Sequence, residues 1–180
     1  MLSKTLHEAM NQHFKSELYA AHLYLSMSAY CDSVNLSGFA HWMLVQAEEE
    51  RGHAMRFYGF IRDRGGRVIV PSVEQPPIEF TSPLDVFEQA LAHERQVAAR
   101  INELYGLALQ EKDYASQAFL QWFVTEQVEE DRLLSQLVET LKLAGDNGAA
   151  LLMLDRELGA RQARSALGQE NRALSPEPGG

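Results

Sequence analysis

The chain contains a single cysteine, Cys31, among its 180 residues, and this scarcity excludes several classes of protein. One cysteine can form neither an internal disulfide nor a cysteine-based zinc or redox motif. Long apolar runs are missing as well, because no segment approaches the 18 or more apolar residues that a membrane helix needs. The amino-terminal segment "MLSKTLHEAM" has no apolar core of the kind that secretory leaders carry. We therefore expect a cytoplasmic protein that does not enter membranes.

Basic residues are also in the minority. Lys and Arg number 16 against 25 Asp and Glu, which gives a formal net charge of -9 at pH 7. A general nucleic-acid binder needs a basic face that displaces the counterions of the phosphate backbone, so the sequence argues against this class. An acidic chain suits a protein that attracts cations, although many acidic proteins carry this charge only for solubility.

Proline and glycine are rare within four long segments in which apolar residues recur at helical spacing. Ser82 and Pro83 have the residue types that favour the N-cap and the first turn of a helix. We expect long helices over residues 4–32, 36–63, 83–111 and 114–143, and a short fifth helix over 149–158. The long helices exceed twice the usual mean length of about 11–12 residues.

The connections between these helices predict an all-α fold. Short links join the first helix to the second and the third to the fourth, whereas residues 63–83 are rich in Gly and Pro and can run the length of a bundle. This pattern is typical of an antiparallel four-helix bundle with one long crossover, here followed by a short C-terminal fifth helix. We expect one domain over residues 1–159 and a flexible tail over 160–180, with its arginines Arg161, Arg164 and Arg172 in solvent.

Each predicted buried stripe carries an acid near the middle of its helix. The stripes read Met10, Phe14, Glu17, Ala21 and Tyr24; Met43, Gln46, Glu50, His53 and Phe57; Leu84, Phe87, Leu91, Glu94, Ala98 and Ile101; and Phe119, Phe123, Gln127, Glu130 and Leu134. Antiparallel packing should bring six polar side chains to one level: Glu17, Glu50, His53, Glu94, Gln127 and Glu130. Four carboxylates in an apolar core need protons or cations to neutralise them. Several carboxylates with one imidazole favour iron or manganese over zinc.

No single member of this set is diagnostic. A Glu-x-x-His pair such as Glu50 and His53 arises easily by chance, and a lone histidine on an apolar face is more often a core residue than a ligand. The alignment of acids on four helices is what favours a metal site. The other histidines, His13 among them, show no partner pattern of comparable strength. Tyr24 fits a structural role and an electron-donating role equally well.

The helical spacing also predicts which apolar residues are buried and which face outward from the bundle. We place Leu25 on the buried face of the first helix. Leu36 and Phe39 are expected on an outward face of the bundle, which would then need covering by other subunits. The fifth helix is too short to fold alone and should also need a partner surface.

Four stretches carry a family resemblance: "SELYAAHLYLSMSAYC", "AEEERGHAMRF", "HERQVAARINEL" and "FLQWFVTEQVEEDRLL". The sequence resembles the non-haem bacterial ferritins over nearly its whole length, to about residue 160. The resemblance implies a ferroxidase that oxidises Fe(II) with dioxygen or peroxide, and a hollow shell of 24 identical subunits that stores ferric mineral.

The same resemblance implies roles for individual residues. Glu17, Glu50 and His53 would bind one iron of a di-iron centre. Glu50, Glu94 and Glu130 would bind the other, so that Glu50 bridges the pair. The remaining implied residues are Gln127 as a hydrogen-bonding support, Tyr24 beside the site, and Glu49, Glu126 and Glu129, which with Glu130 match a third iron site.

Departures from related families narrow this interpretation. Bacterioferritins and di-iron oxygenases carry a second Glu-x-x-His on the fourth helix, where this chain has no histidine. Bacterioferritin haem needs a methionine where this chain has Arg51, so we expect no haem. Two other hypotheses stay open from the sequence alone: a helical interaction module of the cytokine type, and an oxygenase that acts on an organic substrate.

Overall fold

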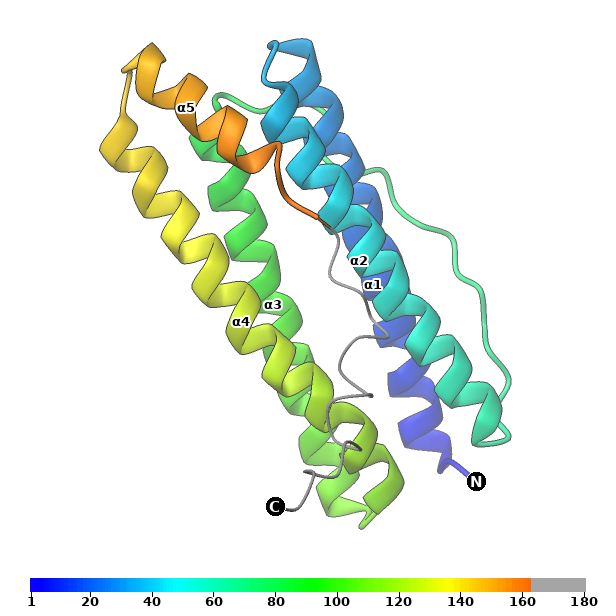
Figure 1. Cartoon of the computed structure of the whole chain (residues 1–180). Helices are drawn as coiled ribbons and strands as arrows, with labels where there is room; N and C mark the ends of the chain where they lie inside the picture. Colours follow the sequence, from blue (N-terminus) through cyan, green and yellow to red (C-terminus); the bar gives the residue numbers. More distant parts are fainter. Residues whose placement is uncertain (163–180) are drawn as a thin grey trace, which may run out of the picture.

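The computed structural model describes residues 1–162, which form five helices and no strand (Figure 1). The helices are α1 (Lys4–Ser33), α2 (Ser37–Asp63), α3 (Pro83–Gln110), α4 (Tyr114–Ala144) and α5 (Gly148–Leu158). Each predicted helix is therefore confirmed, with ends that agree to within one or two residues. The predicted tail beyond residue 162, with Arg164 and Arg172, lies outside the described residues.

Side-chain caps define where most of these helices begin. Ser82 accepts a hydrogen bond from the Asp85 amide, as the sequence predicts, and Pro83 follows in the first turn. The first residues of α2 have no such cap from their own segment. Instead the Asp155 carboxylate of α5 accepts from the amides of Gly38 and Phe39 at 2.8 and 3.0 Å. This contact fixes α5 across the start of α2.

The helices pack as two antiparallel hairpins, α1 with α2 and α3 with α4 (Figure 1). Residues 64–82 connect the hairpins by running along the outside of α1 and α2, and α5 lies across one end of the bundle (Figure 1). Lys15 holds the crossover through an ion pair of 2.8 Å with Glu74. The structure thus confirms a four-helix bundle with one long crossover. None of the helices within residues 1–162 is long and apolar enough to span a membrane.

The core consists of two apolar clusters with a polar layer between them. The cluster nearer α5 includes Met27, Phe39 and Leu134, and the other includes Phe14, Phe57 and Ile101. On every long helix the acid of the predicted stripe stands between the residues of the two clusters. The fold therefore buries its ionisable groups at one level, far from either end of the bundle.

Three predictions about apolar positions were wrong. Leu25 is 47% exposed. The buried stripe of α1 continues from Ala21 to Tyr24, three residues further on, so Leu25, which is four residues from Ala21, points away from the core. Leu36 and Phe39 are 7% and 0% exposed within the single chain. They belong to the apolar cluster that also contains Leu154 and Leu158 of α5, so α5 covers the surface that we had assigned to other subunits.

Candidate metal centre

The structure brings the six predicted polar residues into the layer between the two clusters. Glu17 and Glu94 are 1% exposed, and Glu50 and Glu130 are fully buried. His53 and Gln127 are buried beside them. Within residues 1–162 the layer therefore holds four carboxylates, one from each long helix, in surroundings that penalise uncompensated charge.

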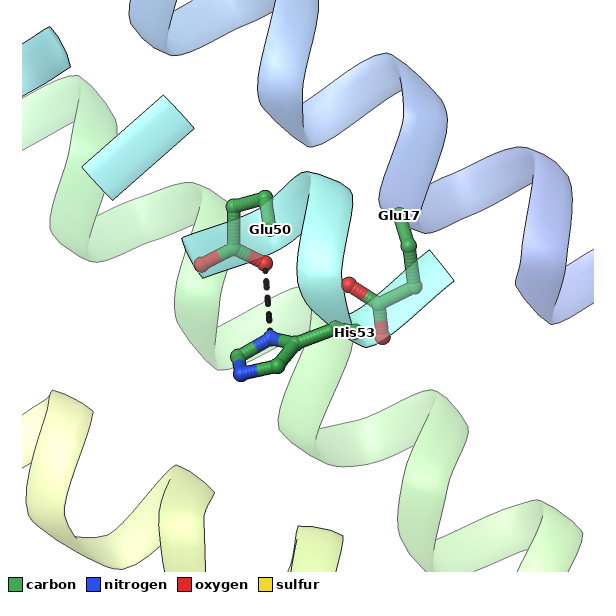
Figure 2. Close-up of side chains that lie close together, drawn as sticks. All are labelled: Glu17, Glu50 and His53. Carbon is green, nitrogen blue, oxygen red and sulfur yellow. Dashed lines mark hydrogen bonds and ion pairs between the residues drawn. The ribbon is translucent and has the colours of Figure 1, made fainter. Parts of the chain in front are cut away.

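The half of the layer formed by α1 and α2 contains a compact group of ligand atoms. Glu17, Glu50 and His53 each place one ligand atom within 4.8 Å of the other two (Figure 2). Figure 2 shows Glu17 reaching from α1 towards the two side chains of α2. His53 Nδ1 lies 3.2 Å from Glu50 Oε2, because residues three apart share one face of a helix. This group has the size and the donor types of a single metal site.

His13 belongs to this half, although the sequence analysis assigned it no partner. Its Nε2 atom lies 2.7 Å from Glu17 Oε1, and its ring packs against Phe57 with centroids 4.6 Å apart. Glu17 Oε2 is buried and has no hydrogen-bond partner among the described residues. His13 thus engages one oxygen of Glu17 and leaves the other available. The spacing of four residues on one helix was the signal that could have revealed this pair.

The half formed by α3 and α4 is organised around Glu94. The Tyr24 hydroxyl donates to Glu94 Oε1 at 2.7 Å, and Gln127 Nε2 donates to Glu94 Oε2 at 3.3 Å. Gln127 Oε1 is buried and has no partner among the described residues. Both donors are neutral groups, so neither compensates the charge of an ionised Glu94.

Gln46 connects the two halves. Its Nε2 atom donates to Glu50 Oε1 at 2.8 Å and lies 3.4 Å from Glu130 Oε2. Gln46 was on the predicted stripe of α2 but was not assigned a role. A neutral side chain that bonds two acids can set their orientation without binding a metal itself.

Burial and mutual repulsion control ionisation in the layer. Burial raises the pKa of Glu94 well above its usual range, and the charges of Glu50 and Glu130 add to this effect. Burial and the nearby Glu94 carboxylate likewise raise the pKa of Tyr24. Burial alone would lower the pKa of His53, but the adjacent Glu50 carboxylate raises it to about 10. Burial alone would raise the pKa of Glu17, but the facing His13, together with His53 and Glu50, outweighs burial and the net shift is downward.

The residues implied for a third iron site lie at the edge of the layer. Glu126 is 9% exposed, whereas Glu129 is half-buried on the same helix. Glu49 Oε2 lies 2.6 Å from Arg161 Nη2. Arg161 was predicted to be in solvent as part of a flexible tail, and that prediction was wrong. The residues just beyond α5 return to α2 and place this arginine against an acid.

The donor set suits a hard or borderline divalent cation. Carboxylates supply most of the ligand atoms and His53 supplies one imidazole, a combination that favours iron or manganese. Two divalent ions would balance the formal charge of four carboxylates, and the two orphaned oxygens of Glu17 and Gln127 lie in the same layer. The residues present therefore fit metal binding, with one compact site at Glu17, Glu50 and His53.

Comparisons with known proteins agree with this geometry. The family described as a ferritin-like domain matches residues 7–144. The chain is 43% identical over 161 residues to the bacterial non-heme ferritin of Staphylococcus aureus, covering 89% of this chain and 97% of that protein. The corresponding protein of Staphylococcus epidermidis is 42% identical over 161 residues, with the same coverage.

Solved structures point the same way. An open-pore ferritin from the hyperthermophilic archaeon Archaeoglobus fulgidus superposes with a TM-score of 0.89 and 49% identity, over 90% of this chain and 100% of that one. An engineered closed form of the same archaeal ferritin gives a TM-score of 0.90 at 49% identity, over 91% and 100% of the two chains.

A buried layer of carboxylates that can bind metal, inside a four-helix bundle with one long crossover, is typical of the ferritin-like class. This chain belongs to the ferritin family. Membership supports iron storage and ferroxidase activity, and the group of Glu17, Glu50 and His53 provides a place for metal.

Proposed function

We propose that the chain oxidises Fe(II) with dioxygen or peroxide at a di-iron centre inside each subunit and stores the ferric product. The buried layer of four carboxylates carries this proposal, because burial penalises their charge and two divalent ions would balance it. Each Fe(II) gives up one electron to the oxidant. Carboxylate ligands stabilise the higher charge of Fe(III) and so favour that transfer.

The family resemblance supplies the roles that we propose for the residues, and their burial in one layer supports these roles. Glu17, Glu50 and His53 bind one iron, and Glu50, Glu94 and Glu130 bind the other, with Glu50 as the bridge. The buried ligands come from rigid helices, so the site is held in place before iron arrives. Tyr24 and Gln127 fix the orientation of Glu94 through their hydrogen bonds.

The proposal also covers the surroundings of the centre. Glu49, Glu126 and Glu129, together with Glu130, bind a third iron, and the subunits assemble into a shell of 24 copies in the cytoplasm. We propose no haem, since Arg51 stands where the haem-binding relatives need a thioether. The exposed apolar residues Leu152 and Met153 of α5, which are 56% and 73% exposed, are available for contacts between subunits.

The oxygenase hypothesis has weaker support. An organic substrate needs a pocket that opens onto the metals. A surface pocket of about 940 Å³ lies between α1 and α3, and it is lined by residues that include His13 and His93. None of Glu17, Glu50, His53, Glu94 and Glu130 lines it. We therefore favour iron itself as the substrate.

The deciding experiment is a stoichiometric titration of the metal-free protein with Fe(II) under anaerobic conditions, followed by rapid mixing with dioxygen. We expect two tightly bound Fe(II) per subunit and a fast rise of near-ultraviolet absorbance on oxidation. Size-exclusion chromatography should show a very large particle. Absence of tight Fe(II) binding, or a monomer as the sole species, would refute the proposal.

A further inference from the structure

Arg161 is fixed in place by α2 although it lies beyond the last helix. Its carbonyl oxygen accepts a hydrogen bond from His41 Nε2 at 2.8 Å. Its guanidinium lies over the Trp42 ring, 4.2 Å from the ring centroid, and donates to the Trp42 carbonyl oxygen at 3.4 Å. The side chain is only 12% exposed. Contacts of main chain, ring and guanidinium together anchor this residue.

The end of the guanidinium reaches two side chains of the metal layer. Arg161 Nη2 lies 2.6 Å from Glu49 Oε2 and 2.8 Å from Gln46 Oε1. The Glu49 side chain is 9% exposed, so the ion pair is largely removed from water. A short hydrogen bond between two charged groups in such a place is among the stronger ones in proteins.

We propose that Arg161 is a tethered cation that holds Glu49 in the metal-free subunit, so that a third metal ion must displace it before Glu49 can bind. This inference rests on the proposed function, which assigns Glu49 to the third site. A carboxylate oxygen that accepts from a guanidinium has less electron density for a metal, and a metal bound there would face a like charge. Arg161 therefore weakens the third site selectively.

Gln46 adds a connection from this contact to the paired centre. Arg161 donates to the oxygen of the Gln46 amide, which directs the Gln46 nitrogen towards Glu50 and Glu130. When a third ion displaces the guanidinium, Gln46 loses the partner that fixes its orientation. Occupation of the third site is thereby transmitted to two ligands of the paired centre.

The test is anaerobic calorimetric titration of the full-length protein with Fe(II), in the wild type and in Arg161→Gln. The two tight ions should bind to both proteins, and their affinities should change much less than that of the third ion, because Arg161 reaches their ligands only through Gln46. The third ion should bind about tenfold more tightly to Arg161→Gln, or become detectable only there, because the competing charge is gone. Arg161→Lys keeps the charge without the two-pronged guanidinium and should give an intermediate value.

Matched variants separate the contact from other effects. Arg156→Gln makes the same charge change at an exposed position of α5 and should leave the third ion unaffected. Adding Glu49→Gln to Arg161→Gln should abolish the gain, since the acid that Arg161 holds is then missing. Deleting residues 160–180 should reproduce the effect of Arg161→Gln, whereas deleting residues 163–180 should not.

The outcomes distinguish the two proposals. If two ions bind but the third is unchanged in Arg161→Gln, or improves equally in Arg156→Gln, the tethered-cation inference is overturned and the proposed function stands. If the wild type binds no pair of ions, the proposed function fails and this inference falls with it. Circular dichroism of each variant establishes that the helices are retained.

Discussion

The two halves of the carboxylate layer compensate their charge in different ways. In the half formed by α1 and α2 each acid faces an imidazole: Glu17 faces His13 at 2.7 Å, and Glu50 faces His53 at 3.2 Å. In the half formed by α3 and α4, the donors to Glu94 among residues 1–162 are the neutral Tyr24 hydroxyl and the neutral Gln127 amide. One half thus relies on nitrogen bases and the other on neutral hydrogen bonds.

This difference determines where protons reside before metal binds. The pKa of Glu17 is lowered, which favours its ionised form, whereas burial raises the pKa of Glu94 and favours its protonated form. In the first half the proton sits on His53, whose pKa is about 10. The surroundings of Glu17 therefore favour the charged form that a metal ligand needs, and we expect this half to bind the first metal ion.

The largest effect on both halves should come from removing Glu50, the acid that we propose they share. Glu50→Ala should slow aerobic Fe(II) oxidation at least about 100-fold, because neither iron keeps its bridge. His53→Ala should also slow it severely, since the layer loses its nitrogen ligand. Stopped-flow absorbance measures the rate, and Glu48→Ala on the exposed side of the same helix is the control. Wild-type rates in both layer variants would remove the paired site from consideration.

Substitutions in each half separately should show which ion depends on it. His13→Leu should weaken the first ion about tenfold, because Glu17 loses the contact that orients it, and should affect the second ion less. Tyr24→Phe should leave the first ion unchanged and alter the second, which needs Glu94. His13→Gln, which can still donate to Glu17, should restore part of the affinity. Calorimetric titration with Fe(II) resolves the two events, and equal losses in both variants would contradict the division into halves.

Proton release on metal binding should also differ in its source between the two halves of the layer. The first ion should displace a proton from His53 and the second a proton from Glu94, because both groups have raised pKa values, which favour their protonated forms, and must lose the proton to bind metal. The affinity of both events should therefore fall as the pH is lowered. Titrations in buffers of different ionisation enthalpy count the protons. Glu94→Gln should eliminate the second release, and persistence of that release would place the proton elsewhere.

Much of this layer could be predicted because helical spacing is a local property. Glu17, Glu50, Glu94 and Glu130 occupy the same stripes as neighbouring apolar residues, so their inward direction follows from the sequence of each helix. The level at which they meet follows from helix length and antiparallel order. The prediction for Leu25 was wrong, because the buried stripe of the first helix advances three residues from Ala21 to Tyr24, and Leu25, one residue further on, faces solvent.

The features that were missed depend on contacts between distant segments. Asp155 caps α2 across more than a hundred residues of sequence, and nothing near Leu36 or Phe39 indicates that α5 will cover them. Arg161 likewise looks like any solvated arginine until the chain beyond α5 turns back onto α2. His13 is the exception, since its partner is one turn away and the pair could have been recognised.

Asp113, an ion-paired acid outside the layer, contrasts with Glu94 because its pKa is lowered and not raised. Its substitution should have the smallest effect of those considered. Asp113 caps α4 and accepts two hydrogen bonds from Arg64 at 2.9 and 2.8 Å. These hydrogen bonds are the main reason why the pKa of Asp113 is lowered to about 2. An acid whose pKa is lower in the folded state contributes stability at neutral pH, and this contribution is lost as the pH falls from about 4 through about 2. Asp113→Asn retains a capping oxygen but loses the charge, so it should reduce the free energy of unfolding by about 1 kcal/mol near pH 7.

The difference between Asp113→Asn and the wild type should shrink as the pH falls below about 4, because Asp113 of the unfolded chain then takes up a proton, and it should vanish once the folded state is also protonated near pH 2. Urea unfolding followed by circular dichroism at a series of pH values measures it, with Asp63→Asn as an exposed control at the end of α2. Glu94→Gln should behave in the opposite way in metal-free protein, since burial raises the pKa of this carboxyl group and so favours the neutral form that glutamine resembles. It should cost little or even stabilise near pH 7. A loss of stability at pH 7 as large as that of Asp113→Asn would mean that Glu94 is ionised there, and the contrast between the two halves would not hold.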